Sequence, residues 1–464
     1  MLSKESMQRI INAALDSTAD FAEVFVENTV QQSIALQSNT VENAVNSEKF
    51  GVGIRIGKGH NHVYGYTNKK SEDALLKLAK NLATSYSGPR VREYIELPKL
   101  RSSDNHQATI TPKNVDTKDK VKLVKKVNDA ARSYSDEIQQ VNVSYMDTLQ
   151  DVWVASSENI YTTDRRVRTR LGIAAVAKND TDMQMGFNGP GASKGFEFYD
   201  EIDVESEAKE AARIAVTMLY ADEAPSETIP VVVDNGFGGV IFHEACGHSL
   251  EATSVAKNAS VFSGKKGEKI GSDLVTAIDD GTIENAWGSQ NFDDEGRPQQ
   301  RRVLIKNGVL NTYMVDYLNG KRMGEAPTGS SRRQSYRYAP TSRMSNTYIA
   351  NGESTFEDII AATKYGLYAK KMGGGSVQPS TGDFNFAVME GYMIRDGKIA
   401  EPVKGATLVG TGKDALQKID MVGNNLLRAQ GMCGSLSGAI PTDVGQPTLR
   451  ISNITVGGRK ESAQ

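Results

Sequence analysis

Residues 241–252, "IFHEACGHSLEA", place His243 and His248 close together, with Glu244 directly after the first histidine. Neutral imidazole is a good ligand for Zn²⁺, and a neighbouring carboxylate can take a proton from a water molecule at the ion. The two histidines are five residues apart, whereas the H-E-x-x-H helix of zinc peptidases spaces them by four. The segment therefore predicts a metal site only if its helix is locally irregular.

The five-residue interval requires a particular kind of irregularity. On an ideal α-helix, residues five apart are separated by about 140° around the axis, because each residue turns by about 100°. A turn with i→i+5 hydrogen bonds brings His243 and His248 nearly into line, and such π-helical turns concentrate at functional sites. Gly247, just before the second histidine, lowers the steric cost of the distortion. We therefore expect a π-bulge between the histidines, with Glu244 as the general base.

A zinc site needs a third protein ligand. The three remaining histidines, His60, His62 and His106, all lie in the first half of the chain. His60 and His62 flank Asn61 in an expected hairpin tip, where solvated side chains are the favoured interpretation. The histidines outside the motif are therefore weak candidates.

The two cysteines are better candidates for the third ligand. Cys433, in "GMCGSLSG", is favoured because a thiolate binds zinc strongly, its glycine neighbours allow close backbone approach, and a distant ligand completes a tetrahedron with less strain. Cys246 lies three residues after His243 and can share a helix face with it. A small apolar residue packed inward would occupy the same position, so Cys246 stays open as the alternative.

Composition narrows the class of protein. A chain of 464 residues favours two domains. The net charge of −3 lacks the basic field that nucleic-acid binding needs, so we expect no nucleic-acid partner. Two cysteines are too few for a disulfide framework, which favours a reducing, cytoplasmic location. No apolar run approaches the roughly 18 residues of a membrane span, and the N-terminus has the pattern of an amphipathic helix instead of a signal peptide.

The pattern along the chain predicts an α+β protein with two domains, residues 1–225 and 226–464, joined by a linker at 221–230. The first domain is expected to mix helices and strands. Expected helices cover 7–15, 71–83, 121–131 and 204–219, and expected strands cover 22–38, 50–67, 139–147 and 167–179.

The second domain is expected to be catalytic and rich in antiparallel sheet. A buried strand at 229–234 precedes a helix at 235–258 that carries the histidine motif. Ser354 and Glu357 have the spacing of a capping box at the start of another helix. Two dipeptides between apolar runs favour tight hairpin turns: Asn307-Gly308 and Asp396-Gly397.

Two further segments have less specific patterns. The glycine run 373–375, within "KMGGGSVQPSTGDFNF", favours tight turns, with a backbone surface for an added peptide strand as the alternative. Residues 332–338 gather arginines and tyrosines, and favour a loop with surface ion pairs. Single-stranded nucleic-acid binding and an oxyanion-stabilising Tyr336 or Arg337 remain the alternatives there.

Several segments of the second half resemble the TldD/PmbA family of metallopeptidases. They are residues 243–282, 291–310, 322–348, 421–434 and the closing 445–458. The resemblance covers 225–464 closely and the first half more loosely. It points to the TldD branch, because the PmbA branch generally lacks the H-E-x-x-x-H motif.

The resemblance implies roles for individual residues. It implies that His243, His248 and Cys433 hold Zn²⁺, and that Glu244 is catalytic. It further implies hydrolysis of flexible or unfolded peptides and peptide precursors, by a dimer with a PmbA-like paralogue or with itself. The rival interpretation is a non-catalytic peptide-binding or regulatory subunit of a peptidase complex.

Overall fold

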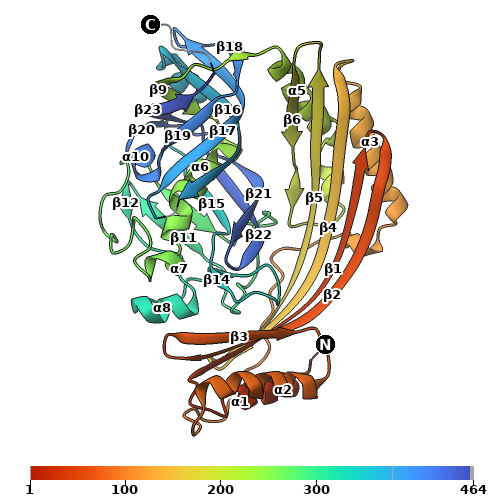
Figure 1. Ribbon diagram of the computed structural model, residues 1–464, viewed down its shortest axis with the longest axis vertical. Helices are drawn as coiled ribbons and strands as arrows, with labels where there is room; N and C mark the ends of the chain where they lie inside the picture. The colour runs from red at the N-terminus through yellow and green to blue at the C-terminus, as the bar shows by residue number, and fades with distance from the viewer. Residues whose placement is uncertain (1, 379, 460–464) are drawn as a thin grey trace.

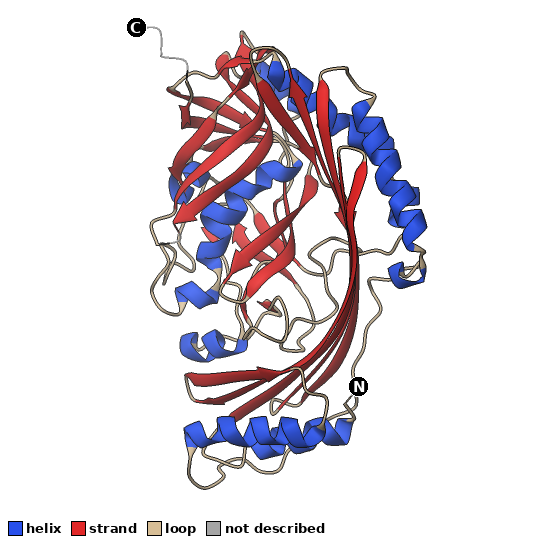
Figure 2. Ribbon diagram, turned by 45° about the vertical axis from the view of Figure 1, so that its right-hand side comes forward, coloured by secondary structure: helices blue, strands red, loops and turns tan. Residues whose placement is uncertain are grey.

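The first half of the chain forms one long curved sheet with helices on its outer side (Figures 1 and 2). The computed structural model describes residues 2–378 and 380–459. The helices of this half are α1 (Lys4–Ala14), α2 (Glu72–Ala83), η1 (Thr84–Tyr86), η2 (Pro112–Asn114), α3 (Thr117–Arg132), α4 (Phe198–Glu201) and α5 (Val204–Leu219). Its strands are β1 (Phe21–Gln37), β2 (Thr40–Lys58), β3 (Asn61–Thr67), β4 (Ile138–Ser156), β5 (Ile160–Lys178), β6 (Met183–Asn188) and β7 (Gly191–Ala192).

This sheet is antiparallel throughout, in the order β3-β2-β1-β4-β5-β6, with β7 paired to β5. Strands β1, β2, β4 and β5 are each 17 to 19 residues long. β4 and β5 therefore extend past the predicted strands 139–147 and 167–179, up to a tight turn in which Asn159 has φ 59°. In these added parts of both strands, charged and polar residues interrupt the alternation of apolar and polar side chains by which a strand is predicted from sequence.

Two helix pairs cover the sheet because each helix has one apolar face. Residues of α1 and α2 enclose one core with the strands that they cover, and residues of α3 and α5 enclose a second core at the other end of the sheet. In α1, the buried stripe includes Met7, Ile10, Ile11 and Ala14, at helical spacing. The four predicted helices of this half are confirmed with small shifts of their ends.

The second half contains two larger sheets and a third core that runs from Ala224 to Val456. Its helices are η3 (Gly236–Gly239), α6 (Val240–Phe242), η4 (His243–Gly247), η5 (His248–Leu250), α7 (Ala252–Val255), α8 (Tyr317–Met323), α9 (Phe356–Ala361) and α10 (Gly412–Gln417). Its shorter strands are β8 (Asp222–Glu223), β9 (Glu227–Val233), β10 (Ala277–Asp280), β11 (Arg301–Lys306), β12 (Val309–Leu310), β13 (Ser331–Arg332), β14 (Thr341–Ser342) and β15 (Asn346–Ile349). The remaining strands are β16 (Tyr365–Gln378), β17 (Asp383–Arg395), β18 (Lys398–Lys404), β19 (Thr407–Thr411), β20 (Ile419–Val422), β21 (Leu427–Ser435), β22 (Gly438–Gln446) and β23 (Leu449–Gly457).

One sheet has the order β12-β11-β10-β15-β22-β21, so that β21 is an edge strand. In the other sheet, β16, β9, β23, β19 and β17 close into a ring because β16 also pairs with β17. Most neighbours are antiparallel, the exceptions being β15–β22, β16–β9 and β18–β8. The predicted α+β class and the antiparallel-rich second half are confirmed, and the boundary at residue 225 stays a prediction.

Local turn chemistry was mostly predicted well. Both hairpin dipeptides, Asn307-Gly308 and Asp396-Gly397, join adjacent strands, and all four residues have positive φ. The capping box of α9 is one residue later than predicted, because Thr355 and Asp358 form it in place of Ser354 and Glu357. The predicted linker 221–230 is also wrong in part, since it contains β8 and the start of β9.

Buried ion pairs join the two halves near the end of the long sheet that α1 and α2 cover. Arg55 of β2 lies 2.7 Å from Glu23 of β1 and 2.6 Å from Glu295 of the second half. Arg333 also pairs with Glu23, at 2.7 Å. Removal of one partner would leave an uncompensated buried charge, so the two halves must meet with each of these carboxylates beside an arginine.

In the described residues, the search for a helix able to span a membrane finds none.

Candidate metal centre

The predicted helix 235–258 is not continuous. Strand β9 leads through η3 and α6 into η4 and η5, and the chain then becomes extended at Glu251 before α7 (φ −76°, ψ 126°). The helical turns therefore change type several times within the motif. The prediction of one long helix is wrong, since Glu251 ends it three residues after His248.

The turn between the histidines is π-helical, as the five-residue spacing predicts. η4 spans His243–Gly247, and the backbone N–H of His248 donates to the carbonyl oxygen of His243, five residues earlier. The two imidazole ring centroids lie 5.2 Å apart, at an interplanar angle of 84°. Both imidazole rings are therefore close enough to bind the same metal ion.

Cys433 of β21 completes the cluster. Its Sγ lies 3.2 Å from Nε2 of His243 and 3.3 Å from Nε2 of His248. A ligand atom from each of the three residues lies within 4.8 Å of the other two. The structure thus brings together the three residues that the sequence favoured as metal ligands.

Glycines, which have no side chain, allow the helical segment that carries the histidines to approach β22. Gly239, before α6, lies against Gly445 of β22, and a Cβ at Gly239 would come within 2.5 Å of that backbone. A Cβ on Gly247 would come 2.3 Å from the sulfur of Met344. Since β22 pairs with β21, close approach of the helix to β22 places His243 beside Cys433.

The cluster is buried, and its groups strongly shift one another's pKa values. Cys433 is 3% exposed. Burial by itself would raise the pKa of the Cys433 thiol, but the adjacent imidazoles of His243 and His248 hold the pKa well below its usual range. Burial likewise opposes charge on His248, yet Glu251 and Cys433 raise its pKa well above the ordinary value. The sulfur therefore has thiolate character, which is the form that binds metal.

Glu244 lies at the open side of the cluster. Its Oε2 is 3.6 Å from Nε2 of His248, and its Oε1 is 4.0 Å from Nε2 of His243. Its side chain is 27% exposed, so water can reach it. A carboxylate in this position can exchange a proton with a water molecule at the cluster.

Glu251 also contacts the cluster, and the sequence-based interpretation did not single it out. Its Oε1 lies 3.2 Å from Nδ1 of His248, the ring nitrogen that faces away from Cys433. Helical spacing offered a signal, because Glu251 follows His248 by three residues. Nδ1 of His243, in contrast, is buried without a hydrogen-bond partner among the described residues.

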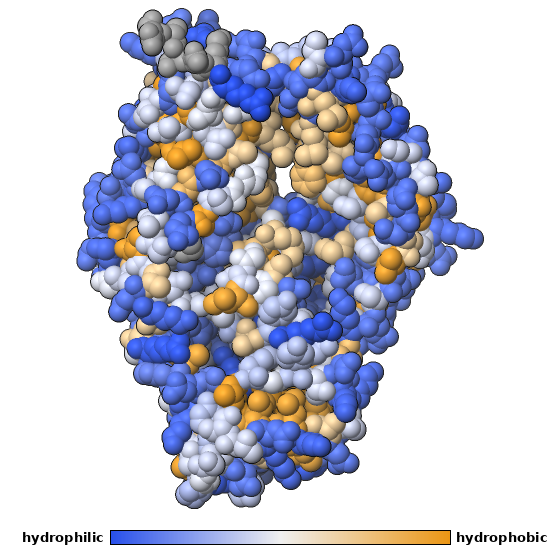
Figure 3. Space-filling model, viewed as in Figure 1, coloured by the Kyte–Doolittle hydropathy of each residue, from blue (hydrophilic) through white to orange (hydrophobic). Residues whose placement is uncertain are grey.

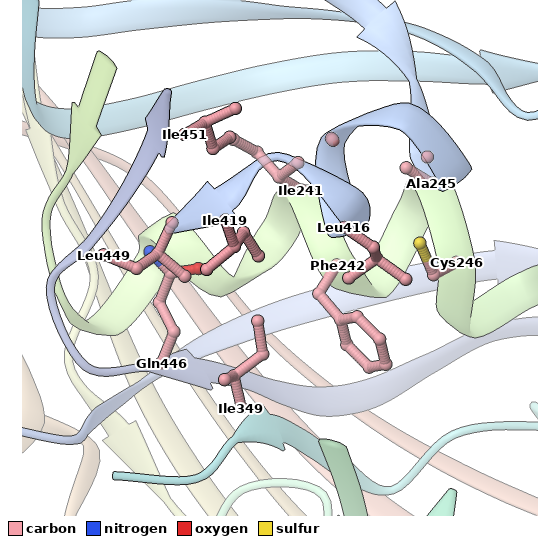
Figure 4. A pocket seen from close by; sticks show the side chains of 12 residues that line it. Ile241, Phe242, Ala245, Cys246, Ile349, Leu416, Ile419, Gln446, Leu449 and Ile451 are labelled. Carbon is pink, nitrogen blue, oxygen red and sulfur yellow. The ribbon is translucent and has the colours of Figure 1, made fainter. Parts of the chain in front are cut away.

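Cys246 points away from the cluster, into the core. It lines a small apolar cavity of about 20 Å³ with Ile241, Phe242 and Ala245 from the same helical segment (Figure 4). Burial raises the pKa of its thiol above the usual range. Its place among apolar side chains fits the packing role that had been weighed against metal binding.

The remaining histidines lie elsewhere. His60 is exposed, and His106 accepts a hydrogen bond from the backbone N–H of Asn285. His62 is not solvated as predicted, because its ring stacks on Phe21, with centroids 5.2 Å apart. Burial, together with the positive charge of Arg55, lowers the pKa of His62 to about 3.

The arginine–tyrosine segment 332–338 is mostly internal, so the predicted surface ion pairs are wrong. Arg333 is buried and pairs with Glu23 at the joint between the halves. Tyr336 packs against Phe25 in a small core cluster. Gln334 and Arg337 are the exposed residues of this segment. A buried arginine cannot contact nucleic acid, which removes the main support for that alternative.

The glycine run 373–375 lies within β16 and not in the tight turns that were favoured. Met372 pairs with Val388 and Gly375 with Phe386, so the run contains a β-bulge. Gly373 and Gly374 lie at the wall of a cleft. Glycine allows a bulge at which the backbone is open to an approaching ligand.

The cleft separates the long sheet from the second half and has a volume of about 510 Å³. Its wall includes Arg170 and Phe187 from the long sheet, and Phe237, Lys371 and Met432 from the second half. Figure 3 shows the surface hollowed between the halves, with many residues of intermediate or apolar hydropathy around the hollow. Met432 directly precedes Cys433, so the cleft extends along the strand that carries the cluster.

Comparisons with known proteins agree over the whole chain. Residues 226–458 match the model described as the PmbA/TldA metallopeptidase C-terminal domain, 110–219 match the central domain, and 22–85 match domain 1. A protein of Haemophilus influenzae named metalloprotease TldD homolog is 36% identical, over 98% of this chain and 97% of its own. A homolog of the same name from Buchnera aphidicola (from Acyrthosiphon pisum) is 35% identical, over 95% of this chain and 93% of its own.

Solved structures share the fold. A crystal structure from Thermotoga maritima superposes with a TM-score of 0.78 at 21% identity, over 98% of this chain and 99% of that one. TldE from Thermococcus kodakarensis gives 0.76 at 17% identity, over 98% of this chain and all of that chain.

The family models and the relatives identify the class of protein as a metallopeptidase, and the chain belongs to the PmbA/TldD metallopeptidase family. The relatives that match it at 35–36% identity carry the TldD name, which confirms the resemblance seen in its motifs.

Proposed function

We propose that the protein is a zinc-dependent peptidase that hydrolyses flexible or unfolded peptides and peptide precursors. The observation that carries the proposal is the convergence of two imidazoles and a thiolate within 4.8 Å, with a solvent-accessible carboxylate beside them. Two nitrogens and one sulfur are a donor set that suits Zn²⁺, and three protein ligands leave one position for water.

The metal would be held by His243, His248 and Cys433. A zinc ion there supplies Lewis acidity, which favours ionisation of a water molecule and polarises a peptide carbonyl. The lowered pKa of the Cys433 thiol supports this assignment, because the thiolate is the form that binds metal.

Glu244 is the general base of the proposal. Its carboxylate accepts a proton from the attacking water at Oε1 or Oε2 and later donates it to the nitrogen of the leaving amine. Its position, 3.6 to 4.0 Å from the two ligating nitrogens, supports this role because it can reach the water without replacing a ligand.

The cleft supports a peptide without stable structure as the substrate. Strand β21 has a free edge in its sheet, and the bulge at Gly373–Gly374 lies in the same cleft. An extended peptide that hydrogen-bonds to exposed backbone is recognised mainly through its main chain. Most backbone groups of a folded domain are already hydrogen-bonded, whereas an unstructured chain presents them freely, so flexible substrates are favoured.

We also propose that the enzyme works in the cytoplasm as a dimer, with a PmbA-like paralogue or with itself. Its family membership and low cysteine content support these assignments. The rival function is a non-catalytic subunit that binds peptides for a partner enzyme. The presence of Glu244 and both histidines favours the catalytic function.

Metal analysis coupled to peptide digestion tests the proposal. Purified wild-type protein should contain stoichiometric zinc and cleave unstructured peptides, as followed by mass spectrometry, and a chelator should abolish cleavage. The His248→Ala variant should lose both the metal and the activity. Wild-type protein that binds peptides but neither retains zinc nor cleaves them would support the non-catalytic rival.

A further inference from the structure

The environment behind His248 contains a buried chain of polar contacts outside the proposed ligand set. Oε1 of Glu251 lies 3.2 Å from Nδ1 of His248 and 3.8 Å from Nε of Arg343. Glu251 is 4% exposed, and Arg343 is fully buried. Neither contact has hydrogen-bond geometry, so the link is one of charge: the buried carboxylate of Glu251 lies between the imidazole of His248 and the guanidinium of Arg343.

The same guanidinium also holds the strand that carries Cys433. The Nη2 atom of Arg343 donates to the carbonyl oxygen of Cys433 at 2.5 Å, and Nη1 donates to the hydroxyl of Ser437 and the carbonyl oxygen of Gly438, each at 2.9 Å. These acceptors surround the turn between β21 and β22. Arg343 therefore contacts the backbone of one ligand residue and the carboxylate behind another.

We propose that Glu251 and Arg343 are positioning residues that together orient His248 and Cys433 for metal binding. The inference rests on the proposed zinc site and assigns to that site two residues beyond its ligands. The carboxylate of Glu251, beside Nδ1, holds the His248 ring with Nε2 facing the sulfur of Cys433. Arg343 fixes the position of Cys433 relative to that ring through its hydrogen bond to the Cys433 carbonyl oxygen.

The two histidines differ in the contacts that they make behind the ring. His243 has no polar partner at its Nδ1 among the described residues, so no polar contact behind the ring helps to orient it. His248 and Cys433 come from separate elements and share one link through Arg343. Carboxylates behind metal-ligating histidines typically contribute 10- to 100-fold to metal affinity.

Zinc affinity and the cobalt spectrum test the proposal in the full-length protein. Zinc dissociation constants are measured by chelator competition, and Co²⁺-loaded protein is examined for ligand-field and thiolate-to-metal absorption bands. We expect Glu251→Gln to weaken zinc binding about tenfold and Glu251→Ala up to about 100-fold. Arg343→Lys should weaken it about tenfold and alter the thiolate band, because Cys433 loses its carbonyl contact.

Glu390→Gln is the matched control. Glu390 is also a buried glutamate paired with an arginine, Arg213, at 2.8 Å, but it belongs to β17. That variant should keep wild-type zinc affinity and the wild-type cobalt spectrum even if its stability falls. A purely structural role for Glu251 would give the same result as this control.

The outcomes separate this inference from the proposed function. If wild-type protein binds zinc and cleaves peptides while folded Glu251 and Arg343 variants keep affinity within twofold, the positioning role is overturned and the function stands. Should the Glu251 variants fail to fold, Arg343→Lys decides by the same criterion. Wild-type protein without zinc affinity would overturn both.

Discussion

The sulfur of Cys433 lies 3.2 Å from Nε2 of His243, although 190 positions separate the two residues in the chain. One belongs to a helical turn that follows β9, and the other to the edge strand β21. Their contact shows that the cluster depends on how the sheet of β21 and β22 packs against the helix. It also explains why a local motif alone cannot complete the site.

Glu244→Gln should separate metal binding from catalysis. The amide keeps the size of the side chain but cannot accept a proton, so peptide hydrolysis should fall at least about 100-fold. Zinc content should remain at the wild-type value, because Glu244 is not among the proposed ligands. Mass spectrometry of peptide digests and metal analysis of the same sample provide the measurement, and full activity in this variant would eliminate the mechanism.

The two cysteines should respond oppositely to substitution by serine. Cys433→Ser removes the thiolate and should weaken zinc binding by more than about 100-fold, beyond the effect expected for groups behind the ligands. Cys246→Ser should keep zinc but lose about 1–3 kcal/mol of unfolding free energy, because a hydroxyl enters an apolar cavity. Chelator competition and urea unfolding distinguish the two, and loss of zinc in the Cys246 variant would contradict the assignment.

The ion pair at the joint of the halves should contribute strongly to stability. Arg55→Ala leaves Glu295 buried without its cation and removes one of the two arginines that pair with Glu23, which should cost about 3–5 kcal/mol in urea unfolding. Arg395→Ala is the control, since its pair with Glu401 is partly exposed to solvent and should contribute no more than about 1 kcal/mol. Equal effects of the two substitutions would contradict the role of the joint.

Glu27 should make stability fall between mildly acidic and neutral pH. Burial raises the pKa of this carboxyl from about 4.5 to about 7 in the folded protein. Between these values the unfolded chain releases the proton while the folded chain retains it, so stability decreases as pH rises. The loss levels off above pH 7 at about 3 kcal/mol.

Glu27→Gln tests this dependence because it is neutral at every pH. The variant should match wild type near pH 4 and exceed its unfolding free energy at pH 8, as measured by urea titration at both values. Glu390→Gln should be destabilising at pH 8, because hydrogen bonding to Arg213 outweighs burial and lowers the pKa of Glu390. A Glu27→Gln difference that is independent of pH would contradict the prediction.

The sequence by itself determined the features that depend on neighbouring residues. The interval between His243 and His248 required a π-helical turn, since no regular helix aligns residues five apart. Asn307-Gly308 and Asp396-Gly397 specified hairpins because they adopt positive φ at low cost. Chemistry favoured Cys433 over Cys246, although it could not place either sulfur.

The tertiary structure decided the features that depend on contacts between residues far apart in the chain. The contact of Gly239 with Gly445 brings Cys433 to the histidines, and no local pattern encodes that approach. Arg333 looks like a surface residue in the sequence, yet Glu23, 310 positions away, makes its burial possible. Glu251 is buried behind His248 with Arg343 3.8 Å away, and a buried carboxylate is stable only where the fold supplies its partners.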